Sequence, residues 1–437
     1  MFIGAAVCRL LLSRRIILRV AMNETNERLL LTTQFRPTPW GDHTIMPEYG
    51  GGSITSVPRF IERALGLKPD QTPLNQAVEE LPSYDRIMLF ILDGIGYRRV
   101  LSLFDAHPDL ILRALGERGW FFPLTSVFPS TTVAALASLS TGMTPLEHGL
   151  IGYRLYLRET SSITNMIRFS LLGSRRSDAA FDAGLDPERL LPGPTFHERL
   201  QQHRVAAHTL LPQTIVGSGL SKALYKGSKS LHPVAGLSDM LVIARQLLQK
   251  AKSKTFLSLY WPGLDTIAHI RGPETDAYVA ELRAVDDAIR RELVGRVDQT
   301  LFIFTSDHGF VPMSPHDYIQ LRDDDGANNA LLLPPVGEPR ASYFFTRNGE
   351  TERVARFLAE KHEDGLVCLD PNEILSAGLL GTGTPHPEIE NRLGDLVAVS
   401  TGRAGIFHPY PDATMLRGMH GGLTEDEMLV PFIVSPL

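Results

Sequence analysis

The sequence has few cysteines and no excess of positive charge. Only Cys8 and Cys368 occur among 437 residues, so neither a disulfide framework nor a cysteine-rich zinc module is expected. The formal net charge of -6 argues against a basic scaffold for nucleic acid. An anionic substrate would therefore have to be attracted by a local site, where a bound metal ion could supply positive charge.

A long uninterrupted apolar run is also missing. A membrane-spanning helix needs about 20 consecutive apolar residues, and a secretory signal carries its charges ahead of its apolar core. The apolar start of the chain meets neither requirement, so the sequence predicts no transmembrane segment and a cytoplasmic location. Residues 1–21 are interpreted as an extended start, with a membrane-surface helix as the alternative. Four charges interrupt this start: Arg9, Arg14, Arg15 and Arg19.

The composition is sufficient for a large hydrophobic core, because 43% of the residues are hydrophobic. Residues 1–82, rich in proline and glycine, are expected to form an irregular N-terminal extension with one helix near 57–67. Residues 83–437 are expected to form one main domain. Two insertions are predicted in it, at about 151–254 and 312–416.

Three short apolar runs, at residues 86–92, 255–261 and 300–306, predict buried parallel strands. An amphipathic helical pattern over 279–293 lies between the second and third runs. Strand, helix and strand in this order indicate a doubly wound α/β sheet, which binds ligands beyond the carboxyl ends of its strands. Acidic or imidazole residues follow each run and should meet at that edge: Asp93, Asp265, Asp307 and His308.

Small residues over 131–142 predict a helix that begins near Thr131 or Thr132. Threonine is a common N-cap and needs no further purpose. The same position nevertheless suits a phosphate, since free backbone N–H groups and the helix dipole face it.

Two further patterns are typical of metal ligands but are weak alone. Asp265 and His269 lie one helical turn apart, so both could face one ion, although a solvated pair at the start of a helix is the alternative. His420 precedes two glycines, which allow close approach of the backbone to a ligand. In combination with Thr132 and the acidic and imidazole residues at the strand ends, these residues fit the order and context of one known family.

Residues 86–437 resemble the alkaline phosphatase superfamily, and within it the type I phosphodiesterase/nucleotide pyrophosphatase family. The resemblance implies an α/β fold: an alkaline-phosphatase-like three-layer sandwich with a mostly parallel central sheet and cap insertions. The motifs that carry it are LDG at 92–94, FPSTTVAALASLSTG at 128–142, GLDTIAHIRGP at 263–273, SDHGF at 306–310 and HGGLTEDEMLVPFIV at 420–434.

The resemblance also implies two divalent metal ions, zinc in the family, with manganese also compatible. Imidazole and carboxylate groups suit zinc, and metal coordination can hold a threonine hydroxyl as an alkoxide. Thr132 is the expected nucleophile because it is the fourth residue of the family pattern that begins at Pro129. The expected ligands of one ion are Asp93, Asp307, His308 and Thr132, and those of the other are Asp265, His269 and His420.

The implied activity is hydrolysis of a small phosphodiester or nucleotide pyrophosphate through a phospho-threonine intermediate. A phosphonate or phosphomonoester hydrolase, similar to phosphonoacetate hydrolase, is the alternative on the same site. An inactive binding homologue would have lost a ligand, and all seven are present. Ala135 departs from the best-known family members, which carry an asparagine there that bonds a phosphoryl oxygen.

Four residues are candidates for substrate contacts, by stacking on a base or pairing with a distal phosphate. Core packing for the aromatic residues and surface solvation for the arginines are the simpler alternatives. His148, within the same family pattern, is interpreted as structural. The four candidates are Tyr153, Arg154, Trp261 and Arg271.

Overall fold

The computed structural model describes residues 35–67, 74, 78, 81–174, 176–321, 326–361, 365–411 and 413–437. The predicted extended start or surface helix at 1–21 lies outside these residues. None of the helices in the described part of the chain has the length and apolarity needed to cross a membrane.

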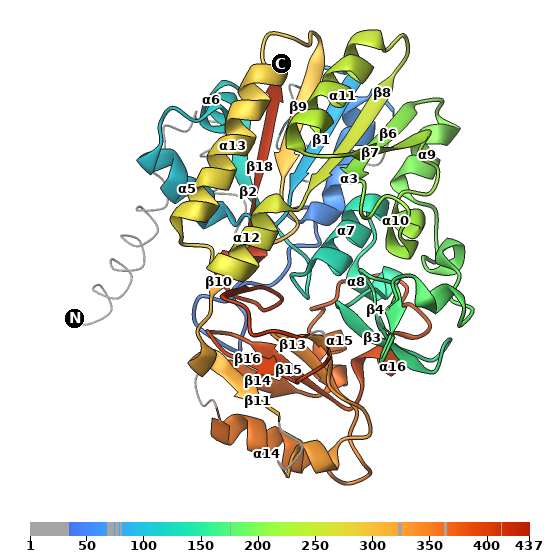
Figure 1. Cartoon of the computed structure of the whole chain (residues 1–437), viewed down its shortest axis with the longest axis vertical. Helices are drawn as coiled ribbons and strands as arrows, with labels where there is room; N and C mark the ends of the chain where they lie inside the picture. Colours follow the sequence, from blue (N-terminus) through green and yellow to red (C-terminus); the bar gives the residue numbers. More distant parts are fainter. Residues whose placement is uncertain are drawn as a thin grey trace, which may run out of the picture.

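The main sheet has seven strands in the order β2-β18-β9-β1-β8-β6-β7 (Figure 1). Its central strands β9, β1 and β8 are the three predicted apolar runs, and they pair in parallel, so that Ile87 of β1 faces Phe256 on one side and Leu301 on the other. Within this sheet, β18 runs in the opposite direction to the other strands. The bounds are β1 Arg86–Leu92, β2 Trp120–Thr125, β6 Ala206–Pro212, β7 Ser230–Val234, β8 Thr255–Trp261, β9 Thr300–Thr305 and β18 Leu429–Pro436.

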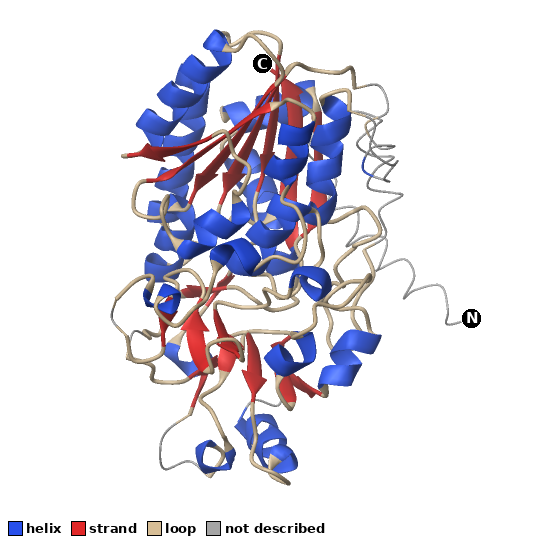
Figure 2. Ribbon diagram, turned by 90° about the vertical axis from the view of Figure 1, so that its right-hand side faces the viewer, coloured by secondary structure: helices blue, strands red, loops and turns tan. Residues whose placement is uncertain are grey.

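Helices cover both faces of this sheet, which gives the expected three layers (Figures 1 and 2). Successive side chains of a strand point to opposite faces. Phe121 of β2 accordingly packs on Tyr97, whereas Phe122 packs on Phe432, which contacts Phe60 from the other layer. One layer contains α5 Tyr97–Ala106, α6 Ile111–Arg118, α11 Leu237–Lys250 and α13 Asp276–Glu292, and the other contains α3 Val57–Ala64, α7 Thr132–Thr141, α9 Phe196–Gln202 and α10 Gly219–Leu224.

A second, fully antiparallel sheet of seven strands lies below the main sheet in Figure 1. Its order is β14-β15-β13-β12-β3-β4-β5. Both predicted insertions contribute to it, because β12 pairs with β3 between Gly337 and Arg154. The bounds are β3 Arg154–Leu157, β4 Ser162–Asn165, β5 Ser170–Leu171, β12 Val336–Glu338, β13 Ala341–Phe344, β14 Leu366–Leu369 and β15 Leu396–Ser400.

Two sequence-based boundaries differ from the structure. The expected insertion at 151–254 is too long, because β6, β7 and α11 within it extend the main sheet and cover it. The predicted helix near 57–67 is present as α3, but it is not part of a peripheral extension. Its Val57, Phe60 and Ile61 are buried in the main core.

The remaining α-helices and strands of the described chain include α12, which holds Asp265 and His269. The helices are α8 Pro145–His148, α12 Gly263–Arg271, α14 Thr351–Lys361, α15 Pro371–Ser376, α16 Ile389–Leu393 and α17 Glu425–Met428. The strands are β10 Val311–Pro312, β11 Tyr318–Gln320, β16 Gly405–Phe407 and β17 Gly418–Met419.

Candidate active site

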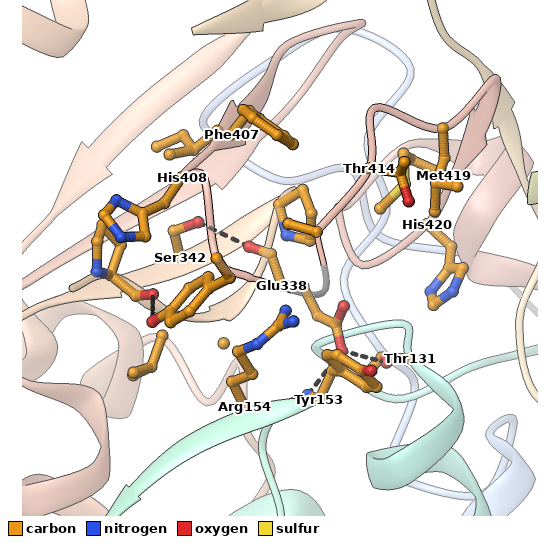
Figure 3. A pocket seen from close by; sticks show the side chains of 18 of the residues that line it. Thr131, Tyr153, Arg154, Glu338, Ser342, Phe407, His408, Thr414, Met419 and His420 are labelled. Atoms are coloured by element: carbon orange, nitrogen blue, oxygen red, sulfur yellow. Dashed lines mark hydrogen bonds between the residues drawn. The ribbon is translucent and has the colours of Figure 1, made fainter. Parts of the chain in front are cut away.

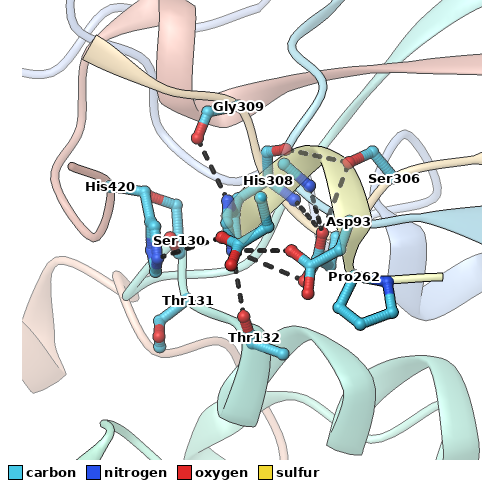
Figure 4. Close-up of polar contacts among 12 residues, drawn as sticks. Asp93, Ser130, Thr131, Thr132, Pro262, Ser306, His308, Gly309 and His420 are labelled. Atoms are coloured by element: carbon cyan, nitrogen blue, oxygen red, sulfur yellow. Dashed lines mark hydrogen bonds and ion pairs between the residues drawn. The ribbon is translucent and has the colours of Figure 1, made fainter. Parts of the chain in front are cut away.

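A cluster of acidic and imidazole side chains lies at the carboxyl edge of the main sheet. Because β9, β1 and β8 are parallel neighbours, the residues that follow them come together there. Asp93 follows β1, Asp307 and His308 follow β9, and α12 begins directly after β8. His420 comes from the loop after β17, and Thr132 is the first residue of α7 (Figure 4).

The first group consists of Asp93, Asp307 and His308, whose potential ligand atoms all lie within 4.8 Å of one another. His308 Nε2 is 3.5 Å from Asp93 Oδ1 and 3.4 Å from Asp307 Oδ2. Thr132 Oγ1 lies 3.1 Å from the same nitrogen. The hydroxyl of the predicted nucleophile therefore faces this group directly.

The second group gathers around Asp265 Oδ1. This oxygen is 3.3 Å from His269 Nε2 and 3.9 Å from His420 Nε2. Asp265, His420 and His308 also offer ligand atoms within 4.8 Å of one another, so His308 lies between the two groups. All seven residues predicted as metal ligands thus lie in one continuous cluster.

Each histidine of the cluster is oriented by the main chain. Its Nδ1 lies within hydrogen-bonding distance of a backbone carbonyl, which can only accept, so Nδ1 carries a proton and Nε2 is the ring atom turned towards the cluster. Burial lowers the pKa of His420, and the neighbouring His308 and His269 lower it further, which favours the neutral ligand form. The anchoring distances are 3.1 Å for His308 to Gly309, 2.9 Å for His269 to Gly418 and 3.0 Å for His420 to Ser130.

Three buried carboxylate oxygens of the cluster accept no hydrogen bond within the described chain: Asp93 Oδ1, Asp265 Oδ1 and Asp307 Oδ2. In two of these carboxylates the other oxygen does accept a hydrogen bond. The Tyr260 hydroxyl donates to Asp93 Oδ2, and Gly94 N–H donates to Asp307 Oδ1. Leaving buried carboxylates without a partner is costly. Burial raises the pKa of Asp93, and the charges of Asp307 and Asp265 raise it further. This donor set fits divalent cations, which would satisfy the three oxygens and neutralise their charge.

A cavity of about 360 Å³ opens beside the cluster. Thr131, Thr132 and His420 line it from the main-sheet side, while Arg154 and Glu338 line it from the second sheet (Figure 3). The two sheets therefore form opposite walls of one pocket, and the predicted nucleophile lies in one of them.

The structure separates the four candidate substrate residues into two pairs. Tyr153 and Arg154 line the cavity, with the Arg154 guanidinium 4.7 Å from the Tyr153 ring and 4.4 Å from the Tyr410 ring. Trp261 and Arg271 are not among its described lining residues. The Trp261 indole donates to Glu281 of α13 at 3.1 Å, and Arg271 is exposed at the end of α12. A substrate role for this second pair is not supported.

Two residues of the site had no signal in the sequence. Tyr260 lies inside an apolar strand, and nothing in that pattern indicates that its hydroxyl reaches Asp93. Glu338 lies in a hairpin of the second sheet, yet its Oε1 accepts from Thr131 Oγ1 at 2.6 Å and from Tyr153 N–H at 2.7 Å. Only the packing of the second sheet against α7 brings Glu338 to the site.

A mostly parallel sheet between two helical layers, with this cluster at its carboxyl edge, places the chain in the alkaline phosphatase superfamily. Residues 88–423 match the family model described as type I phosphodiesterase/nucleotide pyrophosphatase, and the chain belongs to this family of metal-dependent hydrolases.

Curated relatives resemble part of the chain. Venom phosphodiesterase 2 of Crotalus adamanteus is 26% identical over 236 residues, which are 52% of this chain and 27% of the relative. Venom phosphodiesterase of Macrovipera lebetinus is 26% identical over 239 residues, covering 52% of this chain and 26% of the relative. The similarity thus spans about a quarter of these longer proteins.

Solved structures share the fold over most of the chain. Murine ectonucleotide pyrophosphatase/phosphodiesterase 5 aligns with a TM-score of 0.61 at 16% identity, covering 80% of this chain and 88% of its own. Phosphonoacetate hydrolase from Sinorhizobium meliloti 1021, in complex with phosphonoformate, aligns with a TM-score of 0.60 at 20% identity, covering 81% and 90%.

Proposed function

We propose that the chain is a metal-dependent hydrolase of phosphodiester or nucleotide pyrophosphate bonds, with Thr132 as its nucleophile. The observation that carries the proposal is the position of Thr132 Oγ1. It lies 3.1 Å from His308 Nε2, at the N-terminus of α7 and beside carboxylate oxygens that accept no hydrogen bond in the described chain.

The relatives support the same reaction class. The curated relatives are named as phosphodiesterases. A further solved structure, with a TM-score of 0.59 at 16% identity, is an inactive threonine-to-alanine variant of the murine protein in complex with AMP. A threonine nucleophile and a small nucleotide or phosphoester substrate are therefore the assignments we favour for this chain.

In the proposed reaction, Thr132 Oγ attacks the phosphorus atom and the leaving oxygen departs from the opposite side. Thr132 loses its proton and the leaving oxygen gains one, so a phospho-threonine and an alcohol or phosphate product result. Water then hydrolyses the phospho-threonine and restores the hydroxyl. Two divalent ions, zinc by analogy with the family, would be held by the seven clustered residues and would stabilise the charges of both oxygens.

The side chains of the cluster have separate tasks in this scheme. His308 and the carboxylates after β1 and β9 would hold the ion beside the attacking oxygen, and the residues of α12 with His420 would hold the ion beside the leaving oxygen. The N-terminus of α7 directs backbone N–H groups towards a phosphoryl oxygen, which favours negative charge there.

A phosphonate or phosphomonoester substrate is the second candidate. Two observations favour it: the structural likeness to phosphonoacetate hydrolase, and Ala135, which supplies no side-chain amide for a phosphoryl oxygen. A comparison of phosphodiester, phosphomonoester, phosphonate and pyrophosphate substrates in one assay distinguishes these classes.

The decisive variant is Thr132→Ala. We expect the purified protein to contain about two equivalents of divalent metal and to cleave bis-p-nitrophenyl phosphate or a nucleotide p-nitrophenyl ester. Thr132→Ala should abolish turnover and retain metal. Thr141→Ala is a matched control, because its hydroxyl donates to Ala137 O within the same helix. Turnover that survives in Thr132→Ala excludes Thr132 as the nucleophile.

A further inference from the structure

Thr131 occupies the N-cap position of α7 but does not cap the helix. An N-cap threonine ordinarily accepts a hydrogen bond from the second or third backbone N–H of its helix. Here the Thr131 side chain makes no such bond. Its hydroxyl donates instead to Glu338 Oε1, at 2.6 Å.

As a consequence, the first backbone N–H groups of α7 stay available. Thr131 N–H bonds Pro129 O and Ala135 N–H bonds Thr131 O, whereas the N–H groups of Thr132, Val133 and Ala134 have no acceptor in the described chain. These are the groups that a helix start leaves unsatisfied, and the helix dipole makes them attractive to an anion.

An independent observation points to a ligand at the same place. Asp93 and Asp307 are almost completely buried and each has an oxygen without a hydrogen bond, close to the His308 nitrogen that faces Thr132. Cations held there would draw a phosphoryl group against the free N–H groups of α7. Ala135 does not supply the side-chain amide that the best-known family members offer, so these backbone groups are the donors that the start of α7 provides.

Glu338 is held firmly enough to control the Thr131 hydroxyl. Its side chain is buried, and Oε1 also accepts from Tyr153 N–H at 2.7 Å (Figure 3). Its backbone carbonyl accepts from Ser342 Oγ at 2.6 Å. The preceding Gly337 has a φ of 90°, and a Cβ there would lie 2.3 Å from Ala341 O of the neighbouring strand. Only glycine therefore fits at this position of the hairpin that holds Glu338.

We propose that Glu338 is a positioning residue that holds the Thr131 hydroxyl away from the start of α7. The N–H groups of Thr132, Val133 and Ala134 then remain free to bind an oxygen of the phosphoryl group. This inference rests on the proposed function, and it assigns to the second sheet an indirect part in phosphate binding, through the Thr131 hydroxyl. Without Glu338, the Thr131 hydroxyl would rotate to cap α7 and compete with the substrate.

A competing explanation, that Glu338 acts only through its charge, predicts the opposite change in phosphate binding. A carboxylate next to a phosphate repels it, so if Glu338 acted only through its charge, its removal would tighten phosphate binding. The two explanations are separated by the inhibition constant of inorganic phosphate, measured with kcat and KM for bis-p-nitrophenyl phosphate on the metal-loaded enzyme.

We expect Glu338→Ala to weaken inhibition by phosphate and to lower kcat/KM, each by about tenfold. This is less than the roughly 100- to 1,000-fold cost of losing one oxyanion donor, because the Thr131 hydroxyl competes for the N–H group and does not remove it. Glu338→Gln should bind phosphate as the unchanged protein does, because its amide oxygen can still accept from Thr131. In a Thr131→Val background no hydroxyl can cap the helix. There, Glu338→Ala should change phosphate inhibition by less than about threefold, as for groups that act through one another.

Three results would overturn the inference. Tighter phosphate binding in Glu338→Gln or Glu338→Ala would assign the effect to charge. An equal loss with and without the Thr131 hydroxyl would show that Glu338 does not act through it. Unchanged inhibition in Glu338→Ala would remove the role altogether. Should Glu338→Ala not fold, Glu338→Gln alone separates charge from positioning. An unmodified protein that holds metal but cleaves no phosphoester contradicts the proposed function instead.

Discussion

The imidazole rings of His308 and His420 stack face to face, with centroids 3.6 Å apart and an angle of 16° between their planes. Each ring is anchored through Nδ1 on a different backbone carbonyl, so both Nε2 atoms face the carboxylates. Two protonated rings at this distance would repel each other in a buried site. Burial and the neighbouring His308 and His269 lower the pKa of His420, which favours the neutral, metal-binding form of this ring.

Tyr260 orients the carboxylate of Asp93, because its hydroxyl donates a hydrogen bond to Asp93 Oδ2. Tyr260→Phe should lower metal affinity by about 10- to 100-fold, because the carboxylate loses the donor that fixes its orientation. Competition with a chelator measures this change. Tyr343→Phe is the control, since its hydroxyl donates to Ile151 O and touches no residue of the cluster. An equal loss of metal in both variants would contradict an orienting role for Tyr260.

Arg154 should bind the part of the substrate beyond the reacting phosphorus, because it lines the cavity between two tyrosine rings. Arg154→Met should raise KM for a nucleotide pyrophosphate by about tenfold and leave kcat nearly unchanged, as expected for an interaction made equally in substrate and transition state. Arg271→Met, at an exposed position of α12, should leave both constants unchanged. A fall in kcat alone would place Arg154 at the reacting atoms instead.

A buried ion pair joins the second sheet to α17, which in turn contacts the loop that follows His420. Arg340 Nε and a second guanidinium nitrogen donate to the two oxygens of Glu427, at 2.6 Å and 2.7 Å, and both side chains are fully buried. Glu427 in turn accepts from Gly422 N–H at 2.8 Å. Arg340→Met should lower the free energy of unfolding by about 3–5 kcal/mol, because it leaves a buried carboxylate unpaired.

Urea denaturation measures this loss. Adding Glu427→Gln to Arg340→Met removes the unpaired charge and keeps an acceptor for Gly422 N–H, so it should recover part of the stability. If the double variant is less stable than Arg340→Met, the unpaired charge is not the cause of the loss.

His148 should make the fold sensitive to acid. Its Nδ1 accepts from Leu150 N–H at 3.0 Å, and burial, with His386 and Arg392 nearby, lowers its pKa to about 3. The unfolded chain protonates this group near pH 6.5, but the folded chain does not until about pH 3. Its contribution to stability is therefore complete above pH 6.5 and is lost as the pH falls, by about 2 kcal/mol at pH 5.

The check is a comparison of unfolding free energies at pH 7 and pH 5. Asparagine can accept from Leu150 N–H without titrating, so His148→Asn should lose less stability between these two values than the unchanged protein. Equal losses would mean that other groups produce the acid sensitivity.

Local sequence patterns were sufficient for the centre of the fold. The apolar runs of β1, β8 and β9 are continuous because both faces of a parallel sheet are buried. Polar or turn-forming residues follow each run and mark where the strand ends. Since parallel neighbours end at one edge, the convergence of Asp93, Asp265 and Asp307 followed from order along the chain. The small residues of α7 likewise placed Thr131 and Thr132 at a helix start.

The directions of individual side chains did not follow from local patterns. Trp261 ends a correctly predicted strand, yet its indole points to Glu281 of α13 and away from the cavity. The assignment of β6 and β7 to the main sheet was not predicted either, because a strand near the edge of a sheet resembles a strand in an insertion until its partners are known.

The sequence by itself determined the main sheet around β1 and the chemistry at its edge, because both arise from short segments with strong periodicity. The tertiary structure alone decided the opposite wall of the cavity. Glu338 meets Thr131 across 207 positions of the chain, and their contact depends on two distant insertions forming one antiparallel sheet. No local pattern contains such a contact, since it is fixed by which surfaces pack together.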